Sequence, residues 1–189
     1  LNYLGKSYGT FLGAVYADLF PHRVGRLVLD GALDPQSTTE QVNLGQATGF
    51  ELALGAFLQD CLGATTCPLV GDQRQARAQL DTLLADIDAQ PLPTGTPRPL
   101  TEALAVLGIV FALYDEGFWP QLRSALASGL TGDGAPLLGL ADAYAERLPS
   151  GHYRTNANDA IYAVNCLDRP APDGPAEIDS SLPQFDAAS

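Results

Sequence analysis

A serine flanked by glycines stands near the start of the sequence, in the order Gly5-Lys6-Ser7-Tyr8-Gly9. This spacing is typical of a nucleophile elbow, in which a strained turn between a strand and a helix lifts the serine hydroxyl clear of the sheet. The flanking glycines leave room where a Cβ atom would clash. We therefore predict Ser7 as an attacking nucleophile and the backbone N–H of Tyr8 as one donor of an oxyanion hole.

The elements around the motif follow the order that an elbow needs. Residues 1–5 are largely apolar and end at a glycine, which predicts the end of a buried strand. Apolar residues recur at helical spacing over residues 8–20, and we expect this helix to stop at Pro21. The apolar run within residues 24–30 predicts a central parallel strand. Together they predict a right-handed βαβ unit.

Two other interpretations fit a serine in a glycine-rich turn. The turn could merely close a βαβ unit, or it could bind a phosphate. The Walker pattern is absent and the glycine spacing of dinucleotide-binding turns does not fit. The placement between a strand and a helix favours the nucleophile.

Two stretches resemble a known family: residues 2–10 (NYLGKSYGT) and residues 20–31 (FPHRVGRLVLDG). They are similar to exported α/β-hydrolases of the tripeptidyl aminopeptidase and proline iminopeptidase type, whose members release residues or short peptides from free N-termini, some acting as esterases. The resemblance is strongest over residues 2–35 and looser at 61–68 and 160–168. It implies Ser7 as the nucleophile, the Tyr8 N–H as an oxyanion donor, and a helical cap inserted after the second strand.

The family places the triad Asp and His downstream of the elbow, and its other oxyanion donor upstream. The chain has two histidines, His22 and His152, and we interpret both as exposed loop residues. We therefore expect the acid, the base and the second donor to lie outside this chain. Because a serine without a base keeps an ordinary hydroxyl of high pKa, we predict a truncated chain that is inactive alone.

After Pro35 the pattern becomes helical, with no further strand signal. Ser37 to Glu40 is interpreted as a capping box, and Asp72 as the cap of a second helix. Four more helices are expected near residues 104–114, 120–129, 136–148 and 158–167. The predicted fold class is α/β: a partial α/β-hydrolase core (1–35), an all-helical cap (36–168) and a flexible tail leading back to the missing core (169–189). Two parallel strands alone cannot bury both their faces.

Composition excludes several classes of protein. Apolar residues make up 46% of the 189 residues, enough for a core, and a net charge of −12 would repel nucleic acid. No apolar run reaches membrane-spanning length, and no signal peptide is visible. Cys61 and Cys67 are expected to form a local disulfide, with two free thiols as the alternative, while Cys166 stands alone. With the family resemblance, this pair predicts a secreted or envelope protein.

Several further side chains could contact a substrate, but a structural role is favoured for each. The carboxylates that could shape the site or bind a free amine are Asp30, Asp34, Asp115, Glu116 and Asp168. The aromatic residues that could line a pocket are Tyr114, Phe118 and Trp119. The structural interpretations are turn and helix-end chemistry for the carboxylates and core packing for the aromatics.

The leading hypothesis is a serine peptidase acting on free N-termini, with a peptide or ester substrate, no cofactor and no metal. One alternative is a carboxylesterase or lipase-like hydrolase, since a fold does not settle its substrate. Another is a catalytically inactive module that binds ligands through the cap.

Overall fold

The computed structural model describes residues 1–170 and 172–187. The chain divides into two compact units. We call Leu1–Ala47 with Asn165–Ser189 the elbow unit, and Thr48–Val164 the helical unit.

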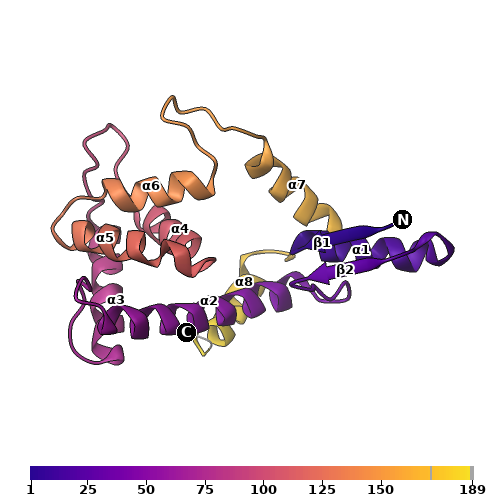
Figure 1. Cartoon of the computed structure of the whole chain (residues 1–189), viewed down its shortest axis with the longest axis horizontal. Helices are drawn as coiled ribbons and strands as arrows, with labels where there is room; N and C mark the ends of the chain where they lie inside the picture. Colours follow the sequence, from indigo (N-terminus) through magenta and orange to yellow (C-terminus); the bar gives the residue numbers. More distant parts are fainter. Residues whose placement is uncertain (171, 188–189) are drawn as a thin grey trace. The chain divides into compact units, whose positions relative to one another are not determined.

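The elbow unit begins with the predicted βαβ arrangement. Strand β1 (Tyr3–Lys6) leads into helix α1 (Tyr8–Leu19), and a 3-10 turn, η1 (Pro21–Arg23), precedes strand β2 (Leu27–Asp30). The strands pair in parallel, with Tyr3 opposite Leu27 and Lys6 opposite Asp30. Figure 1 shows the two strands side by side with α1 running along them. The expected partial α/β fold is confirmed.

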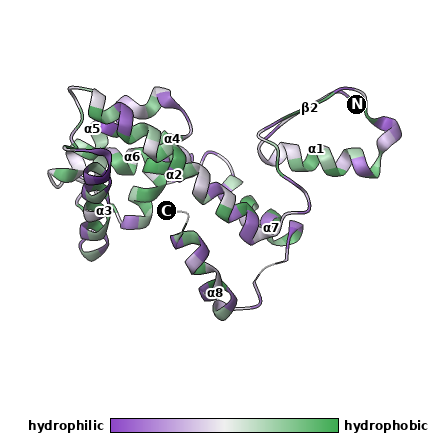
Figure 2. Ribbon diagram, turned by 90° about the horizontal axis from the view of Figure 1, so that it is seen from below, coloured by the Kyte–Doolittle hydropathy of each residue, from purple (hydrophilic) through white to green (hydrophobic). Residues whose placement is uncertain are grey.

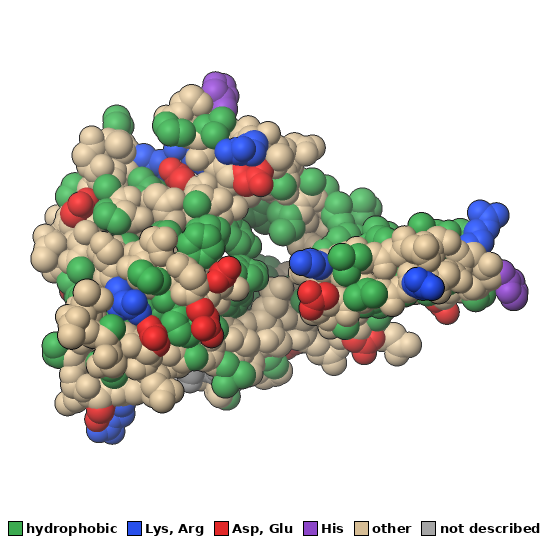
Figure 3. Space-filling model, viewed as in Figure 1, with side chains coloured by type: hydrophobic (Ala, Val, Ile, Leu, Met, Phe, Trp, Pro, Cys, Tyr) green, Lys and Arg blue, Asp and Glu red, His purple; other side chains and the backbone are tan. Residues whose placement is uncertain are grey.

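The two faces of this small sheet differ in exposure. On one face Gly5 is buried, and Tyr3 and Leu29 are partly covered as they pack against α1. On the other face the side chains of Leu4 and Val28 are 62% and 58% exposed. Figure 3 shows hydrophobic side chains among the other side chains on the visible surface. Among the described residues the sheet is therefore covered on one face.

The remaining helices follow the periodicity of the sequence. Their bounds are α2 Thr39–Gly63, α3 Gln73–Ala89, α4 Glu102–Leu113, α5 Trp119–Leu130, α6 Ala135–Tyr144 and α7 Ala157–Asp168, with a 3-10 turn η2 at Glu116–Phe118. All six predicted helices are confirmed. Helix α2 begins in the elbow unit and ends in the helical unit, whereas α7 begins in the helical unit and ends in the elbow unit.

The helical unit has its own hydrophobic core. Phe57 of α2, Leu80 and Ile87 of α3, Leu122 of α5 and Leu137 of α6 are almost completely buried there. Figure 2 shows that α4 is largely hydrophobic, whereas α3 also carries hydrophilic turns. This pattern fits a central helix packed on several sides and a surface helix packed on one.

Two capping boxes fix where helices begin. At α3 the carboxylate of Asp72 accepts from the backbone N–H of Gln75 at 2.8 Å, and the Gln75 side chain accepts from the N–H of Asp72 at 2.9 Å. At α2 the reciprocal pair is Thr38 and Gln41, at 3.2 and 2.9 Å. The predicted box at Ser37 to Glu40 is therefore wrong by one residue, because both positions satisfy the same four-residue pattern.

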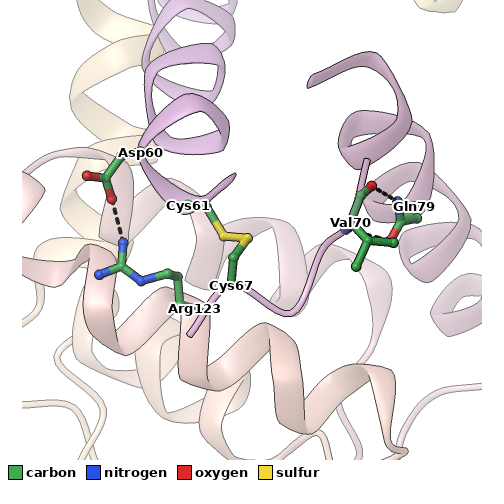
Figure 4. The surroundings of a disulfide bond; sticks show 6 residues. All are labelled: Asp60, Cys61, Cys67, Val70, Gln79 and Arg123. Carbon is green, nitrogen blue, oxygen red and sulfur yellow. Dashed lines mark hydrogen bonds and ion pairs between the residues drawn. A yellow bond between two sulfur atoms is a disulfide. The ribbon is translucent and has the colours of Figure 1, made fainter. Parts of the chain in front are cut away.

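The predicted local disulfide is present. Cys61, near the end of α2, is bonded to Cys67 in the turn that follows, with their Cα atoms 5.0 Å apart. Figure 4 shows this bond beside an ion pair between Asp60 and Arg123 of α5. The same view shows the turn held to α3 by the Gln79 side chain, whose amide donates to the Val70 carbonyl at 2.7 Å. Cys166 is a free, exposed thiol.

The segment predicted as a flexible tail contains a helix that the sequence pattern does not predict. Helix α8 runs over Pro175–Asp186, with Pro175 in its first turn and a second proline, Pro183, inside it. Residue 171 and residues 188–189 lie outside the described residues, so the tail's flexibility stays a prediction. No helix of the described residues has the length and apolar character needed to cross a membrane.

Candidate active site

Ser7 lies in the turn between β1 and α1, where the sequence places it. Its backbone has a φ of 49° and a ψ of −119°. In the described backbone, Ser7 and Glu146 are the residues other than glycine with a positive φ. A conformation of this kind costs about 1–3 kcal/mol and persists only where the surrounding structure imposes it. Such strain at the serine is a feature of nucleophile elbows.

The hydroxyl of Ser7 is not used to stabilise the helix that follows. Serine is favoured as an N-cap because its Oγ accepts from a first-turn N–H, yet Ser7 precedes α1 without a side-chain capping bond. Its backbone N–H donates at 3.0 Å to the carbonyl of Asp30, the last paired residue of β2. The residue as a whole is exposed to solvent.

Gly5 allows the strand and the helix to approach each other closely. A Cβ atom at Gly5 would lie 2.4 Å from the carbonyl oxygen of Gly9 and 2.7 Å from the Tyr3 ring. Real Cβ contacts of this length do not occur, and one of the two neighbours is backbone that cannot move aside. The first glycine of the motif is therefore required by the packing of β1 against the start of α1.

Thr10 stabilises the elbow from the buried side of α1, a role that the sequence analysis did not assign. Its side chain is completely buried. The Oγ1 hydroxyl donates to the carbonyl of Ser7 at 2.6 Å and accepts from the backbone N–H of Leu33 at 2.9 Å. Tyr3 adds a second link, because its hydroxyl donates to the Gly9 carbonyl at 2.8 Å. In the sequence, this role of Thr10 is indicated by a polar residue three positions after the serine.

Tyr8 follows Ser7 and is the first residue of α1. An N–H at this position has no acceptor within its own helix, so it is available to a developing negative charge. The Tyr8 hydroxyl donates to the carboxylate Oδ2 of Asp168 at 2.8 Å. This hydrogen bond, followed by burial and by the negative charge of Asp168, raises the pKa of Tyr8 above its ordinary value.

The end of α7 packs against the start of α1. Asp168 is the last residue of α7, and the guanidinium of the adjacent Arg169 lies over the ring of Phe11, 4.7 Å from its centroid. The Nε of Arg169 also donates to the carbonyl of Ser37 at 3.1 Å. Tyr8 and Phe11, one helical turn apart with ring centroids at 5.7 Å, are thus both held by this pair. The sequence placed Asp168 at a helix end but did not indicate this contact.

Two of the other candidate carboxylates make local turn contacts, and two lie at the end of an element. The side chain of Asp34 accepts from the N–H of Gln36 at 2.9 Å, and that of Asp115 accepts from the N–H of Gly117 at 2.8 Å. Asp30 ends β2, and Glu116 opens η2.

Most of the candidate aromatics form part of the packing in the helical unit. Trp119 meets the buried Phe57 edge to face at 5.9 Å, and Phe118 packs on Phe111 at 4.9 Å. Tyr114 differs, since it is 63% exposed.

Within the elbow unit, His22 is not placed to act as a base on Ser7. His22 lies in η1, beyond the far end of α1, and a helix of 12 residues is about 18 Å long. His152 lies in the helical unit, in the turn between α6 and α7, where its side chain is exposed.

The sequence of this chain is similar to those of several known proteins. A family model described as the alpha/beta hydrolase fold matches residues 1–125. The chain is 39% identical over 177 residues to the serine protease Hip1 of Mycobacterium tuberculosis, covering 90% of this chain and 34% of that protein. It is 40% identical over 158 residues to carboxylesterase B of the same organism, covering 83% of this chain and 30% of that protein.

A third relative is the tripeptidyl aminopeptidase of Streptomyces lividans, 33% identical over 174 residues, covering 89% of this chain and 31% of that protein. The chain thus spans about a third of the length of the curated relatives it matches. The family model covers more than half of the chain, and its match includes the strained turn at Ser7. This chain therefore belongs to the α/β-hydrolase fold family.

Proposed function

We propose that this chain carries the nucleophile of a serine hydrolase that removes residues or short peptides from free N-termini. The proposal rests on the strained turn at Ser7, where the serine hydroxyl makes no capping hydrogen bond to the helix that follows. Relatives named serine protease and tripeptidyl aminopeptidase support a peptidase.

The reaction would proceed through a covalent acyl-enzyme. The Oγ of Ser7 attacks the scissile carbonyl while a base takes its proton, and the resulting oxyanion accepts a hydrogen bond from the Tyr8 N–H. One such donor lowers the barrier by roughly 3 kcal/mol in comparable enzymes. Collapse of the tetrahedral intermediate releases the amine of the leaving peptide. Water then hydrolyses the acyl-enzyme and restores the hydroxyl.

We propose that the triad Asp and His, and a second oxyanion donor, come from parts of a longer protein. The distant His22 and the uncovered sheet face at Leu4 and Val28 support this. In this arrangement residues 1–35 belong to the hydrolase core, residues 36–168 form a cap over it, and residues 169–189 lead back to the core. The 189 residues by themselves would be inactive.

The disulfide supports a location in an oxidising compartment. A Cys61–Cys67 bond persists outside the reducing cytosol. We propose that the protein works outside the cytoplasm, secreted or at the cell envelope, on peptide or ester substrates. With a net charge of −12, it is not expected to bind nucleic acid.

A carboxylesterase is the second candidate, favoured by the relative named carboxylesterase B. The full-length protein should be assayed on a tripeptide p-nitroanilide with a free amine, on its N-acetylated twin and on p-nitrophenyl butyrate. We expect the free-amine peptide to be cleaved and the acetylated twin to be cleaved at least tenfold more slowly. Equal cleavage of the two peptides would exclude the aminopeptidase, and cleavage of the ester alone would favour the esterase. No Ser7-dependent cleavage of any substrate would leave a binding module.

A further inference from the structure

The Tyr8 side chain connects the residue after the nucleophile to a carboxylate 160 positions away in sequence. Its hydroxyl donates to Oδ2 of Asp168 at 2.8 Å. Hydrogen bonds to an ionised acceptor are about twice as strong as neutral ones. The raised pKa of Tyr8 is consistent with this bond, because a hydroxyl proton that is hydrogen-bonded to a carboxylate is harder to remove.

Asp168 is itself held in place. It is half-buried at the end of α7, and the adjacent Arg169 is fixed by its bond to the Ser37 carbonyl and by its stacking on Phe11. Residues three apart on a helix share a face, so Tyr8 and Phe11 present one surface to this pair. A carboxylate anchored in this way can restrain the tyrosine.

The restraint acts where the backbone is strained. Ser7 has a φ of 49°, and relaxation of this turn would move the peptide group that Ser7 shares with Tyr8, including the Tyr8 N–H. Thr10 holds the carbonyl side of Ser7. The Tyr8 side chain is 39% exposed, so packing alone does not immobilise it.

We propose that Asp168 is a positioning residue, which acts through the Tyr8 hydroxyl to hold the Tyr8 backbone N–H in line with the oxyanion. This inference rests on the proposed function of Ser7 and Tyr8. The oxyanion forms only in the transition state, so loss of the restraint should lower kcat and leave KM nearly unchanged.

The test is a double-mutant cycle in the full-length protein, with kcat and KM measured on p-nitrophenyl butyrate and on the free-amine tripeptide anilide. We expect Asp168→Ala and Tyr8→Phe each to lower kcat about tenfold on both substrates, with KM changed less than twofold. The double variant should be no slower than the slower single variant, because both remove the same bond. Asp168→Asn should recover most of kcat, since the amide oxygen still accepts from a hydroxyl.

Matched controls lie in the same unit. Tyr16→Phe removes a hydroxyl from the same helix, and Asp179→Ala removes an exposed carboxylate from α8; neither side chain has a hydrogen bond described in the structure. Both should keep wild-type kcat. Thermal midpoints of all variants identify any that fail to fold, and Asp168→Asn and Tyr8→Phe preserve the test if Asp168→Ala does not fold.

Three results would overturn the inference while leaving the proposed function intact. Multiplicative losses in the double variant would mean that the two residues act independently. Wild-type kcat in Asp168→Ala would mean that the bond does not position the donor. A rise in KM confined to the free-amine peptide, equal in Asp168→Ala and Asp168→Asn, would mean that Asp168 binds the substrate amine. Wild-type activity in Ser7→Ala would overturn both proposals.

Discussion

At the scale of single residues, the elbow is held by groups other than the Ser7 hydroxyl. Ser7 is strained, and its turn is stabilised by the hydrogen bonds of Thr10, the pairing of its N–H with Asp30 and the close packing at Gly5. The sequence predicted Ser7 and Gly5 because their spacing is a local pattern. It could not assign Thr10 or Asp168, since their partners are set by the folded chain and not by their neighbours in sequence.

Replacement of Thr10 tests this support directly. Thr10→Val should lower the free energy of unfolding by about 1–3 kcal/mol, because the partly buried N–H of Leu33 and the carbonyl of Ser7 both lose a partner. Thr10→Ser keeps the hydroxyl and should lose about 1 kcal/mol or less. Urea unfolding of the full-length protein measures both changes. Equal losses in the two variants would show that the methyl group, and not the hydroxyl, stabilises the turn.

Gly5 offers a second test at this scale. Gly5→Ala places a Cβ atom 2.4 Å from the Gly9 carbonyl oxygen, and we expect a loss of about 1–3 kcal/mol in unfolding free energy together with reduced activity. Gly45→Ala, in α2, is the matched control, because an added Cβ there meets no atom within 4 Å. It should be neutral or stabilising by up to about 1 kcal/mol. A Gly5→Ala variant as stable as Gly45→Ala would contradict the close approach.

At the scale of elements, the periodicity of apolar residues predicted α1 and the six helices α2–α7, and the structure confirms them. The start of α2 was misplaced by one residue because Ser37-x-x-Glu40 and Thr38-x-x-Gln41 satisfy the same capping pattern. Helix α8 was missed since its prolines, Pro175 and Pro183, resemble those of a loop. Pro175, in the first turn, is compatible with a helix and indicates where α8 begins.

The contribution of the disulfide to the stability of the helical unit can be measured. Cys67→Ser should lower the free energy of unfolding of this unit by about 2 kcal/mol, because the unfolded chain regains the freedom of a short loop. Cys166→Ser, at the exposed free thiol, should leave stability within about 0.5 kcal/mol of the wild type. Thermal unfolding with and without reductant measures the difference. Insensitivity of the wild type to reductant would mean that the bond contributes nothing.

At the scale of the whole molecule, two strands with one uncovered face make up the described sheet. The family match covers residues 1–125, and the chain spans about a third of the length of its relatives. That the rest of the sheet belongs to a longer protein is our proposal. The sequence predicted this from the same observation, since a parallel pair cannot bury both faces. It could not locate the triad partners, because the folded chain and not sequence spacing decides which side chains reach Ser7; within the elbow unit, His22 lies in η1, beyond the far end of α1.

Covalent labelling of the full-length protein tests directly whether Ser7 is an activated nucleophile. A fluorophosphonate probe reacts with a serine that a base has activated, and the modified peptide can be identified by mass spectrometry. We expect one label, on the peptide containing Ser7, with parallel loss of hydrolysis and no label in Ser7→Ala. A label on a different serine, or hydrolysis that persists in Ser7→Ala, would contradict the assignment of Ser7 as the nucleophile.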